Sequence, residues 1–239
     1  MRLTIDKRFL SYYYEGLDEY PPLQLDLQRT ALLLVDMQKE FILRDAGEAI
    51  RFQADGSWPH WIPFHDRLDR ITVPACETLL HYFRENGLCV TFARIASLLT
   101  NGADRCRIQK QPGWNDILLP VNSDMAQMVD ELAPLPEEIV VNKTTDSVTA
   151  GTNYTLLLRN LGIDTVVVGG IVTDQCVASS IRGLADAGFQ VICVEEACAA
   201  GNMEQHIAEL KIMNCLYCTV LSLEQTLAVL NEAKEESHE

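Results

Sequence analysis

The stretch at residues 165–188, TVVVGGIVTDQCVASSIRGLADAG, decides the fold. Three consecutive valines indicate a strand that is buried on both faces, as in a parallel sheet. Apolar residues then recur at helical spacing from Val177 to Leu184, and Gly188 marks the end of that helix. The stretch therefore predicts a strand that passes into a helix, with Cys176 near the junction.

The same alternation of strand and helix runs along most of the chain. Apolar runs without period-two alternation occur at residues 31–35, 88–93, 139–141, 165–169, 190–194 and 216–221. Helical patterns lie between them, and the last one begins with a capping-box signature at Ser222 and Gln225. This order predicts a three-layer α/β/α fold, in which helices cover both faces of a doubly wound, mostly parallel six-stranded sheet.

Length and two irregular segments indicate the domain organisation. The 239 residues suffice for one sizeable core, so we expect a single domain over residues 1–239. We expect an irregular N-terminal arm at 1–29 and loop insertions near 42–66 and 96–138, because these segments have no clear apolar period. Long insertions in a compact domain are usually lids or binding loops.

Charge and hydrophobicity exclude several classes of function. The formal net charge is −15, and the chain has no Lys/Arg cluster of the kind that binds nucleic-acid phosphates. No stretch approaches eighteen uninterrupted apolar residues, and the first residues have no apolar core of signal-peptide length. We therefore expect no nucleic-acid or membrane partner, a cytoplasmic location and reduced cysteines.

Three strands of the predicted sheet lead to side chains that can take part in catalysis. Asp36 follows the first strand, Lys143 the third, and Cys176 the strand at 165–169. In an open parallel sheet the ligand site lies beyond the carboxyl ends of the strands, so we expect the three side chains to meet. A helix N-terminus and a nearby ammonium favour the nucleophilic thiolate of a cysteine. Taken singly, each residue also has a structural interpretation, as a core cysteine, a turn residue or an exposed charge.

Three segments, LLLVDMQKEF, NKTTDSVTAGT and GGIVTDQCVASSIRGLADAG, resemble the isochorismatase-like cysteine hydrolases. The resemblance extends from about residue 30 to about residue 230. The superfamily includes the carbamoylsarcosine amidases, ureidoacrylate amidohydrolases and biuret hydrolases. It implies that Cys176 is a nucleophile that forms an acyl-enzyme, that Asp36 is the general acid/base, and that Lys143 orients the aspartate and keeps the thiol ionised. It also implies a cis peptide bond at Ile171–Val172 and an oxyanion hole formed by the backbone N–H groups of Val172 and Cys176.

The resemblance also predicts substrate contacts. Phe41 follows the first strand end closely and is expected in the pocket wall. Trp114, within QPGWND, is expected in the pocket, in the core or at an interface. Gln38 and Thr173 lie inside the motifs that carry two of the catalytic candidates. Thr149 stands where many relatives have an aromatic residue, which makes one wall smaller and more polar.

No metal or other cofactor is expected. The metal-dependent nicotinamidases of this superfamily have an Asp-x-His pair after the second strand, and the corresponding stretch here, FARIASLLTNG, contains neither residue type. Cys215 and Cys218 form a C-x-x-C without a second pair, which is a weak zinc signal. His206 lies on the flank of a helical stripe, and we expect it to pack or to form hydrogen bonds.

These observations predict a cysteine-dependent amidohydrolase that cleaves a C–N amide bond of a small carbamoyl, ureide or amide compound. The resemblance further implies a homo-oligomer, either a dimer or a tetramer. Two alternatives stay open: a nicotinamidase-type hydrolase of another primary amide, and a non-catalytic or redox-sensing protein of the same fold.

Overall fold

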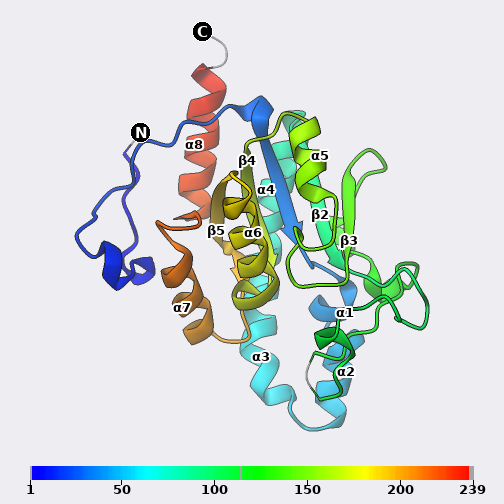
Figure 1. Cartoon of the computed structure of the whole chain (residues 1–239). Coiled ribbons are helices and arrows are strands. Elements are labelled where there is room, and N and C mark those ends of the chain that lie inside the picture. The colour runs from blue at the N-terminus through cyan, green and yellow to red at the C-terminus, as the bar shows by residue number, and fades with distance from the viewer. Residues whose placement is uncertain (1, 114, 237–239) are drawn as a thin grey trace.

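A six-stranded sheet runs through the centre of the molecule (Figure 1). The computed structural model describes residues 2–113 and 115–236. The strands are β1 (Thr30–Val35), β2 (Cys89–Ile95), β3 (Ile139–Lys143), β4 (Thr165–Ile171), β5 (Gln190–Ala199) and β6 (Thr219–Leu221). Their order is β3-β2-β1-β4-β5-β6, and all neighbouring pairs are parallel. The predicted doubly wound sheet is confirmed, and it is parallel throughout.

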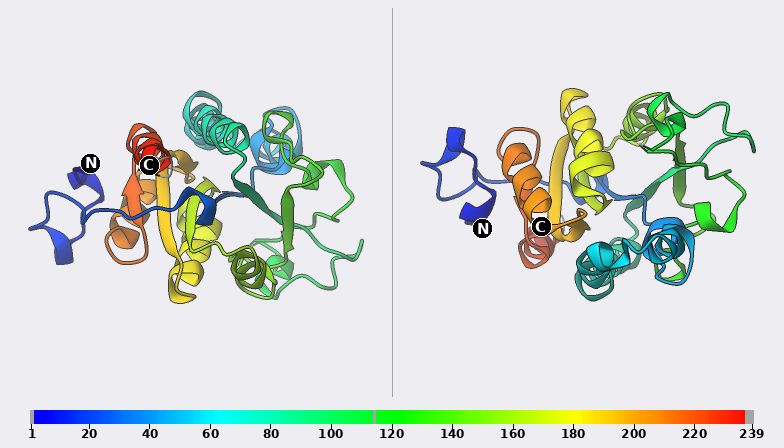
Figure 2. Two further views of the ribbon diagram at one scale, coloured as in Figure 1. Left: turned by 90° about the horizontal axis from the view of Figure 1, so that it is seen from above. Right: turned by 90° about the horizontal axis from the view of Figure 1, so that it is seen from below.

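Helices cover both faces of this sheet (Figure 2). α4 (Val73–Glu85) and α8 (Leu223–Glu236) lie on one face, and α5 (Tyr154–Asn160), α6 (Ala178–Asp186) and α7 (Met203–Met213) lie on the other. The predicted capping box precedes α8: Ser222 N–H donates to Gln225 Oε1 at 3.0 Å, and Gln225 N–H donates to Ser222 Oγ at 3.1 Å. The three-layer arrangement follows from apolar runs that must be covered on both sides.

The centre of the sheet requires a close approach of two backbones. All six residues of β1 are buried, and they pair in register with β4. Gly170 has a φ of +124°, and a Cβ atom there would lie 2.1 Å from the carbonyl oxygen of Val35. Only glycine fits this position, so the double glycine after the three valines brings the ends of β1 and β4 together.

The segment at 42–66 differs from the expected loop. It holds α2 (Gly47–Ala54) and α3 (Trp58–Arg67), preceded by the short α1 (Lys39–Ile42), and a π-helical turn at Leu68–Thr72 joins α3 to α4. The ring of Phe52 on α2 stacks on Trp61 of α3 at 4.4 Å between centroids. Pro63 lies inside α3 and obscures the helical period in the sequence, but this aromatic packing stabilises the pair of helices.

The segment at 96–138 is irregular in its described residues, as expected, apart from three short 3₁₀ turns. The N-terminal arm contains further 3₁₀ turns, and the buried side chain of Asn214 anchors it by donating from Nδ2 to Phe9 O at 2.9 Å. Among the described residues, no helix combines the length and the hydropathy needed to cross a bilayer.

Candidate active site

Three side chains meet beyond the carboxyl ends of β1, β3 and β4. Asp36 follows β1 directly and has a φ of 54°, a left-handed conformation that Asp adopts more readily than most residues. Lys143 is the last residue of β3. Cys176 lies in a π-helical turn at Thr173–Val177, between β4 and α6. The parallel register of the sheet therefore brings together residues that are far apart in sequence.

The ammonium of Lys143 contacts both of the other side chains. Its Nζ lies 2.7 Å from Asp36 Oδ2 and 3.3 Å from Cys176 Sγ, and it also donates to Thr145 O at 3.2 Å. The three residues are 2%, 1% and 5% exposed, in the order Asp36, Lys143 and Cys176. The second carboxylate oxygen of Asp36, Oδ1, is buried and has no hydrogen-bond partner within the described residues.

Burial and the neighbouring charges set the protonation state of this cluster. Burial raises the pKa of Asp36 above its ordinary value, although Lys143 lowers it in part. Burial opposes the charge of Lys143 as well, but Asp36 and Cys176 beside it bring the pKa of the ammonium above its ordinary value. The pKa of the Cys176 thiol is raised well above that of an ordinary thiol, because the sulfur is buried and faces the Asp36 carboxylate.

Burial therefore favours the neutral form of the Cys176 thiol, while Asp36 and Cys176 favour the charged form of Lys143. The ionised thiol stays a prediction: burial and the Asp36 carboxylate oppose a charge on the sulfur, and Lys143 favours it. A buried carboxylate with a free oxygen can act as a base toward such a thiol. The arrangement is thus able to generate a thiolate when it is needed.

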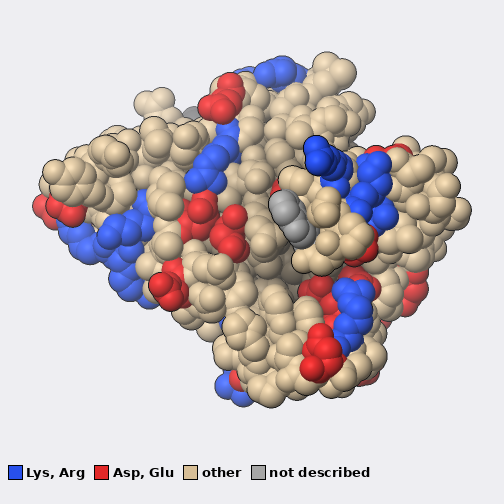
Figure 3. Space-filling view, turned by 60° about the horizontal axis from the view of Figure 1, so that its bottom comes forward, with Lys and Arg blue, Asp and Glu red and all other residues tan. Residues whose placement is uncertain are grey.

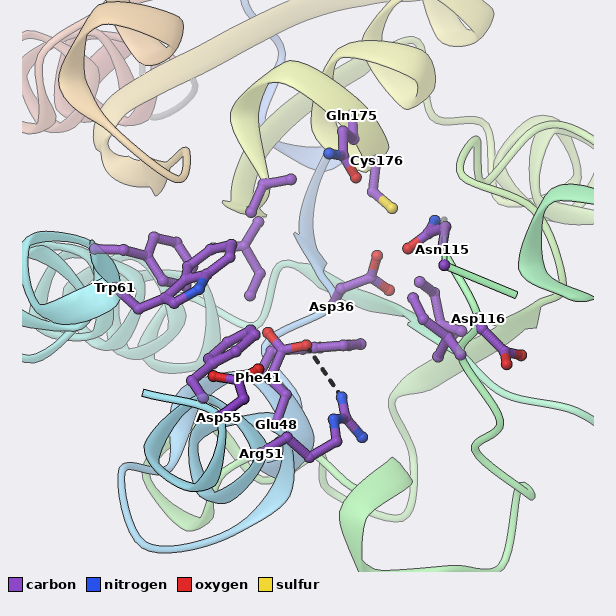
Figure 4. A pocket seen from close by; sticks show the side chains of 17 residues that line it. Asp36, Phe41, Glu48, Arg51, Asp55, Trp61, Asn115, Asp116, Gln175 and Cys176 are labelled. Carbon is purple, nitrogen blue, oxygen red and sulfur yellow. Dashed lines mark ion pairs between the residues drawn. The ribbon is translucent and has the colours of Figure 1, made fainter. Parts of the chain in front are cut away.

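The cluster opens into a cavity of about 660 Å³. Asp36, Gln175 and Cys176 point into it (Figure 4), and Val172 from the strand–helix junction also lines it. The peptide bond between Ile171 and Val172 is cis, as the resemblance implied. Because Val172 and Cys176 both line the cavity, their backbone N–H groups are the candidates for an oxyanion hole.

Aromatic side chains form one wall of the cavity. Phe41 belongs to this wall, as expected, and Phe52, Trp61 and Phe64 from α2 and α3 complete it. Trp61 and Phe64 are 6.1 Å apart in an edge-to-face arrangement. The two helices that the sequence analysis takes for a loop therefore supply most of the apolar wall.

Polar side chains line the cavity as well. They are Glu48, Arg51 and Asp55 from α2, and Asn115 and Asp116 from the irregular segment. The sequence analysis did not single out any of these five. The sequence feature that could have identified them is the presence of charged and polar side chains inside the two segments expected to be lids or binding loops.

Three predicted substrate contacts have other partners in the structure and are not among the residues that line the cavity. The fully buried Gln38 donates from Nε2 to Ile95 O at 2.9 Å and accepts from Ile95 N–H at 2.8 Å, so it joins the ends of β1 and β2. Thr149 Oγ1 lies 2.9 Å from Ser147 Oγ. Thr173 is buried beneath the turn that carries the cysteine. Trp114 lies outside the described residues.

Thr173 belongs to a buried network that connects the turn carrying Cys176 to α3. Its Oγ1 lies 2.8 Å from His206 Nδ1, and His206 Nε2 lies 3.1 Å from Glu195 Oε1. Arg67, the last residue of α3, lies 3.0 Å from the same Glu195 oxygen. Burial lowers the pKa of His206, which favours the neutral ring. His206 is thus a buried hydrogen-bonding residue, as expected, and its partners were not predicted.

The C-x-x-C and Asp146 each make a contact that the structure describes. Cys215 and Cys218 close a tight turn in which Cys215 N–H donates to Cys218 O at 3.0 Å. Asp146, which the sequence analysis did not single out, lies with Oδ1 4.0 Å from Cys176 Sγ. Among the residues that the structure describes, no three His, Cys, Asp or Glu side chains are grouped so that they could hold a metal ion.

Comparisons with known proteins agree with this geometry. The isochorismatase domain family model matches residues 30–225. An uncharacterized isochorismatase family protein, YecD, from Escherichia coli O157:H7 is 30% identical over 87% of this chain and 100% of its own. N-carbamoylsarcosine amidase from an Arthrobacter species is 36% identical over 33% of this chain and 30% of its own. The crystal structure of N-carbamoylsarcosine amidase from Thermoplasma acidophilum has a TM-score of 0.60 and 26% identity, covering 82% of this chain and 96% of that one.

Proposed function

Because the chain belongs to the isochorismatase family, we propose that it cleaves the C–N bond of a small carbamoyl, ureide or amide compound through a covalent acyl-enzyme on Cys176. The relatives named as amidases support hydrolysis of carbon–nitrogen bonds other than peptide bonds. The observation that carries the proposal is the contact of one buried ammonium, Lys143 Nζ, with both the Asp36 carboxylate and the Cys176 sulfur.

The first step is transfer of the thiol proton to Asp36. The cluster begins as a carboxylate, an ammonium and a thiol, and after the transfer it is a carboxylic acid, an ammonium and a thiolate. Its net charge is zero in both states, so no charge is created in the buried site. Lys143 lies next to both anions and stabilises whichever of them carries the charge. Asp36 Oδ1 is free to receive the proton.

The thiolate of Cys176 then attacks the substrate carbonyl carbon, and the backbone N–H groups of Val172 and Cys176 stabilise the negative oxygen that forms. One such donor is worth roughly 10²–10³ in rate in other hydrolases. The tetrahedral intermediate collapses when Asp36 returns its proton to the departing nitrogen, which leaves as ammonia or an amine. Asp36, ionised again, accepts a proton from water, and the resulting hydroxide releases the acyl group from sulfur.

Ammonia release from a panel of ureides and primary amides tests the proposal, with intact-mass detection of an acyl adduct. We expect release from at least one compound and an adduct that Cys176→Ala abolishes. Cys89→Ala is the matched control, because this half-buried thiol is the first residue of β2 and so lies at the amino ends of the strands, away from the candidate site. An adduct that survives in Cys176→Ala, or a panel without any ammonia release, contradicts the proposal.

The same experiment separates the remaining alternatives. Hydrolysis of nicotinamide in preference to the ureides favours a nicotinamidase-type activity, and oxidation of Cys176 without turnover of any amide favours a redox role. The resemblance also supports a homo-oligomer, a dimer or tetramer, and the hydropathy of the sequence supports the proposed cytoplasmic location. Light scattering after size-exclusion chromatography measures the first, and fractionation of cells measures the second.

A further inference from the structure

The polar part of the cavity has an unusual balance of charge for a site that binds a small molecule. Four carboxylates line it, on Asp36, Glu48, Asp55 and Asp116. Arg51 is the single Lys or Arg among the described lining residues. Figure 3 shows that acidic and basic side chains are interspersed over the described part of this face, so no broad basic surface draws an anion toward the opening.

Arg51 already has two acidic partners. Its guanidinium lies 3.0 Å from Glu40 Oε1 and 3.5 Å from Glu48 Oε2. An arginine recognises a substrate carboxylate through the paired N–H groups of its fork, and here the fork is engaged by the protein's own carboxylates. Lys143 is fully buried and holds Asp36 and Cys176. Both cations are therefore already paired with carboxylates of the protein.

We propose, on the basis of the proposed function, that the substrate is an uncharged amide or ureide. In this proposal Glu48 excludes analogues that carry a carboxylate. Glu48 also accepts hydrogen bonds from the N–H groups at the end of the substrate that lies farther from Cys176. In Figure 4 the side chain of Glu48 rises into the cavity from the α2 side, across from Cys176. A molecule whose carbonyl carbon is attacked by Cys176 thus directs its other end toward Glu48. The side-chain amides of Asn115 and Gln175 offer both donors and acceptors, which suits a neutral polar ligand.

Burial supports this role of Glu48. Its side chain is 19% exposed, and burial raises its pKa to about 7. Near neutral pH the group is partly ionised, and every further rise in pH adds negative charge to the cavity wall. A substrate carboxylate would then face a like charge on a mostly buried side chain, which disfavours binding.

Matched pairs of compounds that differ only by a primary amide in place of a carboxylate test the inference. We would measure kcat/KM for malonamide against malonamate and for ureidoacetamide against ureidoacetate, together with biuret. We expect the neutral member of each pair to be favoured at pH 8 by at least about 100-fold. The preference should increase as the pH rises from 6 to 8, because Glu48 loses its proton over this range.

Glu48→Gln removes the charge and keeps the size of the side chain. We expect the preference at pH 8 to fall at least about tenfold in this variant and to lose its dependence on pH, mainly through a lower KM for the carboxylates. Glu85→Gln is the control, because this exposed carboxylate at the end of α4 does not line the cavity.

Equal or faster hydrolysis of the carboxylates by the wild-type protein overturns this inference and leaves the proposed function standing. An unchanged preference in Glu48→Gln also overturns it. If no compound releases ammonia or forms an adduct on Cys176, the proposed function itself is wrong, and this inference falls with it.

Discussion

Replacement of Lys143 by methionine removes the charge that the buried cluster depends on. Methionine keeps an unbranched chain of similar length, so the substitution tests the ammonium rather than the packing. In the described part of the chain, Lys143 makes the one ion pair of Asp36, at 2.7 Å, and both side chains are almost fully buried. At an effective dielectric constant of about 20, this separation corresponds to about 6 kcal/mol of attraction.

The loss of stability has an upper limit that depends on pH. Without Lys143, the buried Asp36 avoids the free-energy cost of an unpaired buried charge by binding a proton. Relative to an ordinary Asp pKa of about 3.9, this protonation costs about 5.6 kcal/mol at pH 8 and about 1.5 kcal/mol at pH 5. Since breaking a buried pair typically costs about 3–5 kcal/mol, we expect Lys143→Met to lose about that much at pH 8 and no more than about 2 kcal/mol at pH 5.

The sign of this pH dependence follows from the direction of the pKa change. Burial raises the pKa of Asp36, and removal of Lys143, which lowers it, raises it further. A carboxyl whose pKa is higher in the folded than in the unfolded state destabilises the fold at high pH. The penalty shrinks as the pH falls below the folded-state pKa, and it vanishes only below the lower pKa of the unfolded state. The variant should therefore approach wild-type stability in acid.

Urea denaturation at pH 8 and pH 5 measures these differences. Lys39→Met is the matched control, because Lys39 forms ion pairs at 3.1 Å with the exposed side chains of Asp124 and Asp130, which should contribute at most about 1 kcal/mol. In the double variant Asp36→Asn with Lys143→Met, both charges are gone, and we expect recovery of at least about 2 kcal/mol at pH 8. A loss below about 1 kcal/mol in Lys143→Met, or a loss that is the same at both pH values, would refute the reasoning.

Three further predictions concern the same region. The value of kcat/KM should fall in acid at a pH above the pKa of an ordinary carboxyl, because Asp36 acts as a base only when ionised and burial raises its pKa. The raised pKa of the Cys176 thiol adds no further loss until the pH exceeds the pKa of an ordinary thiol. A pH–rate profile whose acid limb matches a free carboxyl would count against the buried pair. Thr173→Val should lower kcat about tenfold or more with little change in KM, because it breaks the hydrogen bond to His206 that positions the turn carrying Cys176. Thr173→Ser should restore kcat. A valine variant with wild-type kcat would argue against this positioning role. Gly170→Ala should cost at least about 3 kcal/mol in urea denaturation, because its Cβ would lie 2.1 Å from the backbone of β1; tolerance of this alanine would contradict the close approach of the two strands.

The sequence alone predicted the sheet, the order of layers and the meeting of Asp36, Lys143 and Cys176. This was possible because strand and helix periods are local, and parallel strands place all their carboxyl ends on one edge. The pattern failed at residues 42–66, where Pro63 hides the helical period and aromatic packing between α2 and α3 decides the structure.

Only the tertiary structure decided which side chains line the cavity and in which direction burial moves their pKa values. Gln38 and Thr173 lie inside the catalytic motifs but turn into the protein, whereas Glu48 and Arg51 belong to a segment with no recognisable motif and line the cavity. The raised pKa of the Cys176 thiol likewise follows from burial and from the nearby Asp36 carboxylate. The physical reason is that desolvation and Coulomb interactions depend on distances through space, and neighbours along the chain do not determine those distances.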